Sequence, residues 1–157
     1  MDTCAGNLRL EISIEGDTYL AAKSLILDMK LTNVGLSPMF LFTPGLELGL
    51  QLTLEVLDDA ERPLVIPPLK DIKPNLALEN YMALGAGESI SRREDIAPRL
   101  RSSILRLSNP IHIRVTYSSK DYGAYARMNY GLSAFESAVQ SNVLILHRRP
   151  RSRNAPG

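Results

Sequence analysis

Few residues of this chain have the type and spacing that chemistry requires. Its two histidines, His112 and His147, have no partners at the spacing of a zinc site. The run Asp58-Asp59-Ala60-Glu61 offers carboxylates without the ligand order of a calcium loop, which favours a hairpin turn. No serine lies in a Gly-x-Ser-x-Gly motif, and neither histidine has an orienting Asp at motif spacing. We therefore expect no catalytic residue, no metal site and no cofactor.

Glycines and arginines gather in the middle of the chain. Gly85 and Gly87 favour a tight turn over a phosphate loop, because no helix N-terminus follows them directly. A solvated surface that pairs with nearby carboxylates is the simple interpretation of the arginines, and an acidic partner or anionic membrane is the alternative. These arginines are Arg92, Arg93, Arg99, Arg101 and Arg106, and the carboxylates are Glu88, Glu94 and Asp95.

Four aromatic residues form the best candidate for a contact surface. Tyr122, Tyr125, Tyr130 and Phe135 lie between residues 118 and 140, in a chain with only nine Phe and Tyr residues. Tyrosine offers a stiff contact area with a polar tip, and long loops between strands often bind partners. The alternative is structural: the segment contains another strand, and Tyr130 and Phe135 close the end of the core. Both interpretations stay open.

The elements that would position these residues are mostly short strands. Apolar residues alternate with polar ones over residues 8–14, 25–31, 48–56 and 111–117, which predicts strands with one buried face. Shorter strands are expected at 38–42, 63–66, 81–84, 88–92 and 142–147. The spacing of Ile96, Leu100, Ile104 and Leu107 predicts one short helix or helical turns near residues 95–106. A long connection with three prolines is expected from Pro67 to Asn80.

Composition indicates one ordinary globular domain. The chain has 157 residues, of which 45% are hydrophobic and 22% charged. We expect an N-terminal lead at 1–6, a domain at 7–147 and a basic flexible tail at 148–157. Without the four arginines of that tail, fourteen basic residues face seventeen acidic ones. A body of this sign is a poor platform for nucleic acid.

The single cysteine, Cys4, excludes an internal disulfide and a cysteine-rich zinc site. No apolar run approaches the roughly 20 residues of a transmembrane helix, and Met1-Asp2-Thr3-Cys4 does not resemble a signal peptide. We expect a cytoplasmic protein if the chain is complete, and a cell-envelope or secreted one if an export signal has been trimmed.

Several short motifs together resemble bacterial immunoglobulin-like domains. They are Leu31-Thr32-Asn33 at the end of an early strand, Leu84-Gly85-Ala86-Gly87-Glu88-Ser89 in the middle, Val115-Thr116-Tyr117 late in the chain, and Ser141-Asn142 before the last strand. The chain departs from the pattern in lacking a core Trp and in carrying Ser108-Asn109-Pro110 where a Pro-Gly turn is common. The strand pattern and this resemblance predict an all-β, immunoglobulin-like Greek-key β-sandwich of about seven to nine strands.

The resemblance implies a module that binds or spaces and is not an enzyme. We expect a non-catalytic protein whose partner is another protein, contacted by Tyr122, Tyr125, Tyr130 and Phe135. The alternative is a proteinaceous inhibitor of a hydrolase, which would use the proline-containing connection from Pro67 to Asn80 as a stiff protruding loop.

Overall fold

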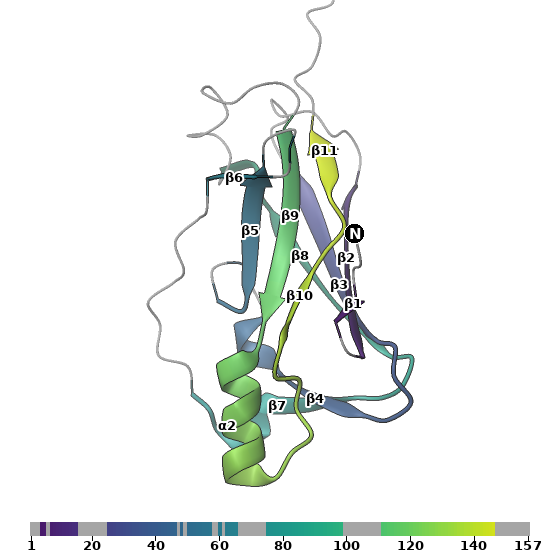
Figure 1. Ribbon diagram of the computed structural model, residues 1–157, viewed down its shortest axis with the longest axis vertical. Coiled ribbons are helices and arrows are strands. Elements are labelled where there is room, and N and C mark those ends of the chain that lie inside the picture. The colour runs from purple at the N-terminus through teal and green to yellow at the C-terminus, as the bar shows by residue number, and fades with distance from the viewer. Residues whose placement is uncertain are drawn as a thin grey trace, which may run out of the picture.

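The chain is built mainly from antiparallel strands, as the computed structural model shows (Figure 1). The structure describes residues 4–5, 7–15, 25–46, 48, 50–57, 60, 62–65, 75–98 and 111–146. Every strand pair within these ranges is antiparallel. The predicted all-β class is therefore confirmed, with the α-helix α2 (Lys120–Tyr130) as an addition to it.

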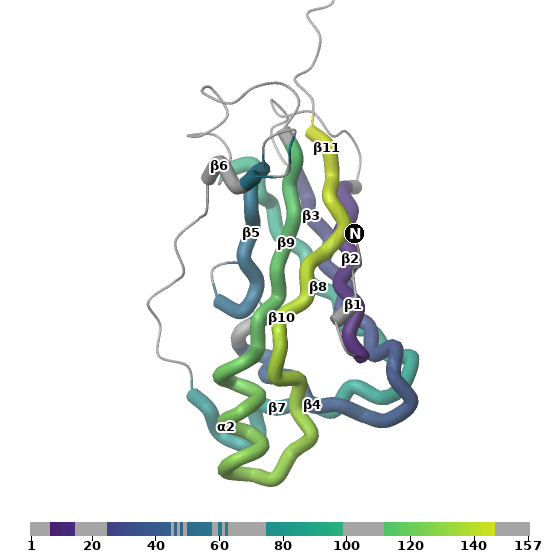
Figure 2. Tube along the Cα trace, viewed as in Figure 1, coloured from purple at the N-terminus to yellow at the C-terminus, as the bar shows by residue number. Residues whose placement is uncertain are grey.

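The first sheet has the strand order β1-β2-β3-β8 (Figure 2). Its strands are β1 (Cys4–Ala5), β2 (Leu8–Glu15), β3 (Ile26–Asn33) and β8 (Ser89–Asp95). Leu10 lies opposite Leu31, which in turn lies opposite Ile90, so the predicted alternation gives the sheet one apolar face. Cys4 pairs with Arg9, so this sheet begins inside the segment that we expected to be a lead.

The second sheet is centred on β9 (Ile111–Ser118). β5 (Leu52–Leu57) pairs with one side of β9, and β6 (Pro63–Val65) continues the sheet beyond β5. On its other side, β9 pairs with β10 (Ala138–Gln140) near its C-terminal end and with β11 (Leu144–Leu146) near its N-terminal end. The last strand is thus split by residues 141–143.

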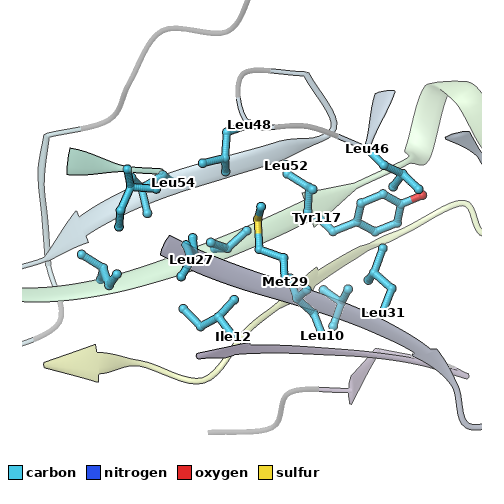
Figure 3. Close-up of a cluster of buried hydrophobic side chains, with 14 of the residues drawn as sticks. Leu10, Ile12, Leu27, Met29, Leu31, Leu46, Leu48, Leu52, Leu54 and Tyr117 are labelled. Carbon is cyan, nitrogen blue, oxygen red and sulfur yellow. The ribbon is translucent and has the colours of Figure 1, made fainter. Parts of the chain in front are cut away.

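The core fills the space between these two sheets (Figure 3). The first sheet contributes Leu10, Ile12, Leu27, Met29 and Leu31, and the second contributes Leu52, Leu54 and Tyr117. Full burial of one such aliphatic side chain stabilises the fold by about 1.5–3 kcal/mol. The two layers therefore hold each other through their facing apolar stripes.

A separate strand pair and α2 lie below the two sheets in the view of Figure 1. β4 (Met39–Phe42) pairs with β7 (Tyr81–Leu84), and the short 3-10 helices η1 (Thr43–Gly45) and η2 (Leu78–Asn80) adjoin them. Phe40 and Phe42 lie on the face of this pair that meets α2. Met39 and Leu41 belong to the main core, so the pair links α2 to the sheets.

Some expected elements differ in the structure. The strand expected from Leu48 begins at Leu52, and Leu48 is a buried residue in an isolated bridge. β8 continues to Asp95, where we expected helical turns to begin, because β3 offers a pairing partner up to Ile26. Ala97 and Pro98 are helical, and residues 99–110 lie outside the described residues.

Candidate functional site

The segment between β9 and β10 is the helix α2, which corrects our expectation of a loop or a strand there. Its C-terminal end is well defined because Gly131 adopts a positive φ of 67°. Gly131 N–H donates to Arg127 C=O at 3.1 Å, and Leu132 N–H donates to Ala126 C=O at 3.3 Å. The bond from Gly131 is that of an αL C-cap, and both bonds satisfy carbonyls that the helix end would otherwise leave unpaired.

Small residues let α2 lie close to the chain that follows it. Gly123 and Ala126 are the buried positions of the helix. A Cβ atom on Gly123 would collide with the backbone oxygen of Phe135. Ser133 C=O accepts from Phe40 N–H at 3.0 Å, and Phe135 N–H donates to Phe40 C=O at 3.2 Å, so this returning segment also pairs with β4. The helix is therefore packed against a backbone that is itself fixed.

Aromatic rings pack α2 against β4 and β7. The rings of Phe42 and Tyr122 are stacked with centroids 5.0 Å apart. Tyr81 contacts Phe42 at 5.3 Å and Tyr130 at 6.1 Å in tilted and edge-on arrangements. Tyr122, Ala126 and Tyr130 recur every four residues, which puts them on one face of the helix. This face is therefore used for packing within the chain.

Hydroxyl groups in this cluster are also satisfied internally. Tyr81 Oη donates to Tyr122 C=O at 2.8 Å, and Tyr130 Oη donates to Leu76 C=O at 2.7 Å. Burial and the neighbouring Tyr130 raise the pKa of Tyr81. Both hydroxyls thus act as neutral donors that tie α2 to β7 and to the chain before η2.

Phe135 lies apart from the three tyrosines of the predicted contact surface. Its side chain is 9% exposed and stacks on Tyr117 in the main core, with ring centroids 5.8 Å apart. Burial raises the pKa of Tyr117 to about 12, and its Oη donates to Gln51 Oε1 at 3.3 Å. The Phe135 ring therefore packs in the main core of the structure.

The outward side of α2 carries Tyr125 and Met128. Tyr125 is 38% exposed and meets Tyr130 edge-on at 5.9 Å, while Met128 is 75% exposed. Leu78, 52% exposed, follows two residues after Leu76, whose carbonyl holds Tyr130. The sequence analysis did not predict Met128 and Leu78 as surface residues, because their exposure depends on the helices α2 and η2 that carry them. The spacing of Tyr125 and Met128 by three residues was the available signal.

The outer face of the second sheet carries a polar network that the sequence analysis did not predict. Arg114 donates through Nε and Nη2 to Glu55 Oε2, and Thr116 Oγ1 donates to Glu55 Oε1 at 3.1 Å. The side chains of Arg114 and Glu55 are only 10% and 15% exposed. Because Arg114 alternates with Ile113 and Val115, the sequence indicated a solvated position.

Of the two histidines and the Asp58-Asp59-Ala60-Glu61 carboxylates, only His112 lies within the described residues. His112 lies between Leu57 and Ile145 in the second sheet, and its Nδ1 has no hydrogen-bond partner. No group of three or more His, Cys, Asp or Glu residues suited to a metal occurs among the described residues. His147, Asp58, Asp59 and Glu61 lie outside the described residues, as do residues 67–74 of the proline-containing connection and residues 148–157 of the tail.

Gly85 and Gly87 form the expected turn between β7 and β8. Glu88 N–H donates to Gly85 C=O at 3.0 Å, and Gly87 has a φ of 79°. Of the arginines singled out, Arg92 and Arg93 lie on β8, and Arg99, Arg101 and Arg106 lie outside the described residues.

In the part of the chain that the structure describes, no helix has the length and apolarity to cross a membrane. No protein-family model matches the chain, and no curated protein matches it significantly.

Proposed function

We propose that the chain is an immunoglobulin-like Greek-key β-sandwich. In such domains the first, second and fifth strands share one sheet, and the third, sixth and seventh share the other, where an extra strand can follow the third. The orders β2-β3-β8 and β6-β5-β9-β10/β11 support this assignment. In it, β9 is the sixth strand, and the split strand β10/β11 is the seventh.

On this scaffold, the proposed function is non-catalytic binding of another protein through the outward side of α2. The observation that carries it is that Tyr125 and Met128 are exposed on a helix whose opposite face is fixed by packing. Because the backbone of the helix is already ordered, binding through it carries no further cost of ordering a loop. Aromatic residues and methionine are also enriched in protein interfaces.

The position of α2 supports the same proposal. The helix connects the sixth and seventh strands of the assigned fold, where immunoglobulin variable domains carry one of their binding loops. Leu78 is included because it is 52% exposed and lies two residues after Leu76, whose carbonyl accepts from Tyr130 Oη. We define the α2 surface as Tyr125, Met128 and Leu78. The buried Phe135 is left out of it.

Capture from native cells tests this surface. The bait is the full chain, used beside the variant Tyr125→Ser/Met128→Ser. A partner held by the wild type should be lost by the variant, and its dissociation constant, measured by calorimetry with the purified partner, should rise about tenfold or more. Circular dichroism checks that the variant keeps its fold.

The matched control is Lys120→Ala, which changes an exposed residue on a different side of the same helix. It should keep the partner. A partner that is retained equally by the wild type and the Tyr125→Ser/Met128→Ser variant would contradict the α2 surface. The turn after β3 would then be the next surface to test, because Leu36 there is 98% exposed.

A further inference from the structure

The exposed residues of α2 form two strips along the helix. Asp121, Tyr125 and Met128 are spaced by four and three residues, which puts them on one side of it. Lys120 and Arg127 each come directly before a member of this strip, so they lie about 100° further round the helix axis. The basic residues of α2 are therefore separated from the side that carries Tyr125 and Met128, and a carboxylate lies on that side instead.

The charges of the two strips differ in their partners. Arg127 Nε donates to Glu136 Oε2 at 2.8 Å, and this bond raises the pKa of Arg127. Asp121 is exposed, and its side chain has no hydrogen bond or ion pair with any other residue that the structure describes. The exposed Glu79 of η2, next to Leu78 of the α2 surface, is in the same state. These two carboxylates suit a cationic group of a partner, because complementary charges favour association.

The Tyr125 ring narrows the kind of cation. Tyr125 is 38% exposed, and the Tyr130 ring meets it edge-on with centroids 5.9 Å apart, so its position is fixed by packing. A cation is attracted to the face of an aromatic ring, and arginine makes such contacts more often than lysine. The guanidinium group is planar and weakly hydrated, so it stacks on a phenol ring more readily than an ammonium group does. The ring therefore favours arginine.

The strip also suits the length of one arginine side chain. Residues four positions apart on a helix have Cβ atoms about 5–6 Å apart, so a guanidinium group on the Tyr125 ring lies within reach of the Asp121 carboxylate. Stacking uses the face of the guanidinium group and leaves the N–H donors at its edge for the carboxylate. Met128, which is 75% exposed, follows Tyr125 on the other side and offers a flexible thioether to the apolar stem of the arginine.

We propose that the α2 surface binds an arginine side chain of its partner protein, with the guanidinium group on the Tyr125 ring and the Asp121 carboxylate and the apolar stem on Met128. This inference rests on the proposed function and names the group by which the partner is recognised. An exposed ion pair alone contributes little, so the ring and Met128 supply most of the affinity, and Asp121 supplies the preference for a cation.

Asp121 also lies in the first turn of α2, where the helix dipole favours a carboxylate. The test therefore compares ligands as well as variants, since helix stability does not alter the choice between ligands. NMR of the full, isotope-labelled chain follows a titration with the blocked tripeptide acetyl-Gly-Arg-Gly-amide. Saturable shifts should be centred on Asp121, Tyr125 and Met128. The matching lysine peptide should bind several-fold more weakly, and the citrulline peptide, which has a similar shape without the charge, should not bind.

Variants on the strip and away from it give the matched comparison. Asp121→Asn and Tyr125→Leu should each raise the dissociation constant of the arginine peptide about threefold or more, and Tyr125→Phe, which keeps the ring, should bind as the wild type does. The control is Glu11→Gln, which removes the same charge from an exposed position of β2. It should bind the peptide with the wild-type affinity. Circular dichroism and the melting temperature identify any variant whose fold has changed.

The arginine contact is overturned by equal binding of the arginine and citrulline peptides, by equal binding to the wild type and Asp121→Asn, or by the absence of saturable shifts at the α2 surface. Equal binding of the lysine peptide overturns the preference for arginine. In the capture experiment, a partner that Tyr125→Ser/Met128→Ser loses but Asp121→Asn holds with an unchanged dissociation constant supports the proposed function and overturns the arginine contact. A wild type that captures no partner but binds the arginine peptide selectively contradicts the proposed function and supports the arginine site.

Discussion

At the scale of single residues, the buried Tyr117 should make the protein less stable as the pH becomes strongly alkaline. Burial raises its pKa from 10.0 to about 12, so folding favours the neutral phenol. Its contribution is complete below about pH 10 and is lost as pH rises through about 12. The difference corresponds to about 2–3 kcal/mol of the free energy of unfolding. Denaturant titrations at pH 9 to 12 should show this loss.

Tyr117→Phe should have a smaller loss of stability over the same pH range, because no phenol at this position ionises on unfolding. Equal slopes for Tyr117→Phe and the wild type would contradict the assignment.

Glu55 offers a second prediction at this scale. Glu55→Ala leaves the largely buried Arg114 without its carboxylate, and breaking such a pair typically costs about 3–5 kcal/mol. The double variant Glu55→Leu/Arg114→Leu should recover much of this loss, because no buried charge remains unpaired. Urea denaturation of the three chains measures both effects. A double variant no more stable than Glu55→Ala would show that Arg114 has a larger structural role.

At the scale of elements, α2 depends on a glycine inside a helix. Alanine usually stabilises a helix by about 1 kcal/mol over glycine. At Gly123 the added Cβ meets the Phe135 carbonyl, which is held by β4. Gly123→Ala should therefore lower stability by about 2 kcal/mol and the melting temperature by about 4–8 °C.

The control is Gly85→Ala, where the nearest atoms to the new methyl group belong to the exposed Glu88 side chain, which can move aside. Its melting temperature should stay close to that of the wild type. Gly123→Ala with an unchanged or higher melting temperature would mean that the returning segment shifts away from the helix easily.

Strands were predictable where each one carries its own apolar stripe. The alternation around Leu10, Leu27 and Val115 predicted β2, β3 and β9, because each of these strands buries one face in the shared core. α2 was not predicted, since its stability comes from Phe42 and Tyr81, which are distant in sequence. Its own composition, with glycine and three tyrosines, has low helix propensity.

The candidate site, like the fold, was predictable only where the signal is local in the sequence. Tyr122, Tyr125 and Tyr130, which are close in sequence, all lie on α2, and their role as a contact surface stays a prediction. The helix determines which of these tyrosines face solvent. The helix itself depends on tertiary packing, which no local sequence pattern shows. Phe135 was misplaced because the chain turns back after Gly131, so the ring enters the main core.

At the scale of the whole molecule, Asn142 joins the two sheets. Its Oδ1 accepts from Ile12 N–H at 2.8 Å, and its Nδ2 donates to Ile12 C=O at 3.0 Å. The side chain thus bonds the edge of β2 from the split between β10 and β11. Asn142→Ala leaves both groups of Ile12 unpaired and should cost about 2 kcal/mol in the free energy of unfolding.

Chemical denaturation measures this loss, and Asn129→Ala is the control. Asn129 is an exposed asparagine with a single bond to Tyr125 C=O at 2.9 Å, so its replacement should change stability by less than about 0.5 kcal/mol. Equal effects of the two replacements would mean that water satisfies Ile12 in the variant.

The split last strand also sets the order in which the fold can form during synthesis. Ile12 leaves the ribosome long before Asn142, and one side of β9 has no partner until residues 138–146 have been made. A nascent chain therefore carries an unpaired edge of its central strand until residues 138–146 have been made. Contacts of long sequence separation form slowly, so the backbone groups of Ile12 in β2 stay without their partner Asn142 until this last strand has been made.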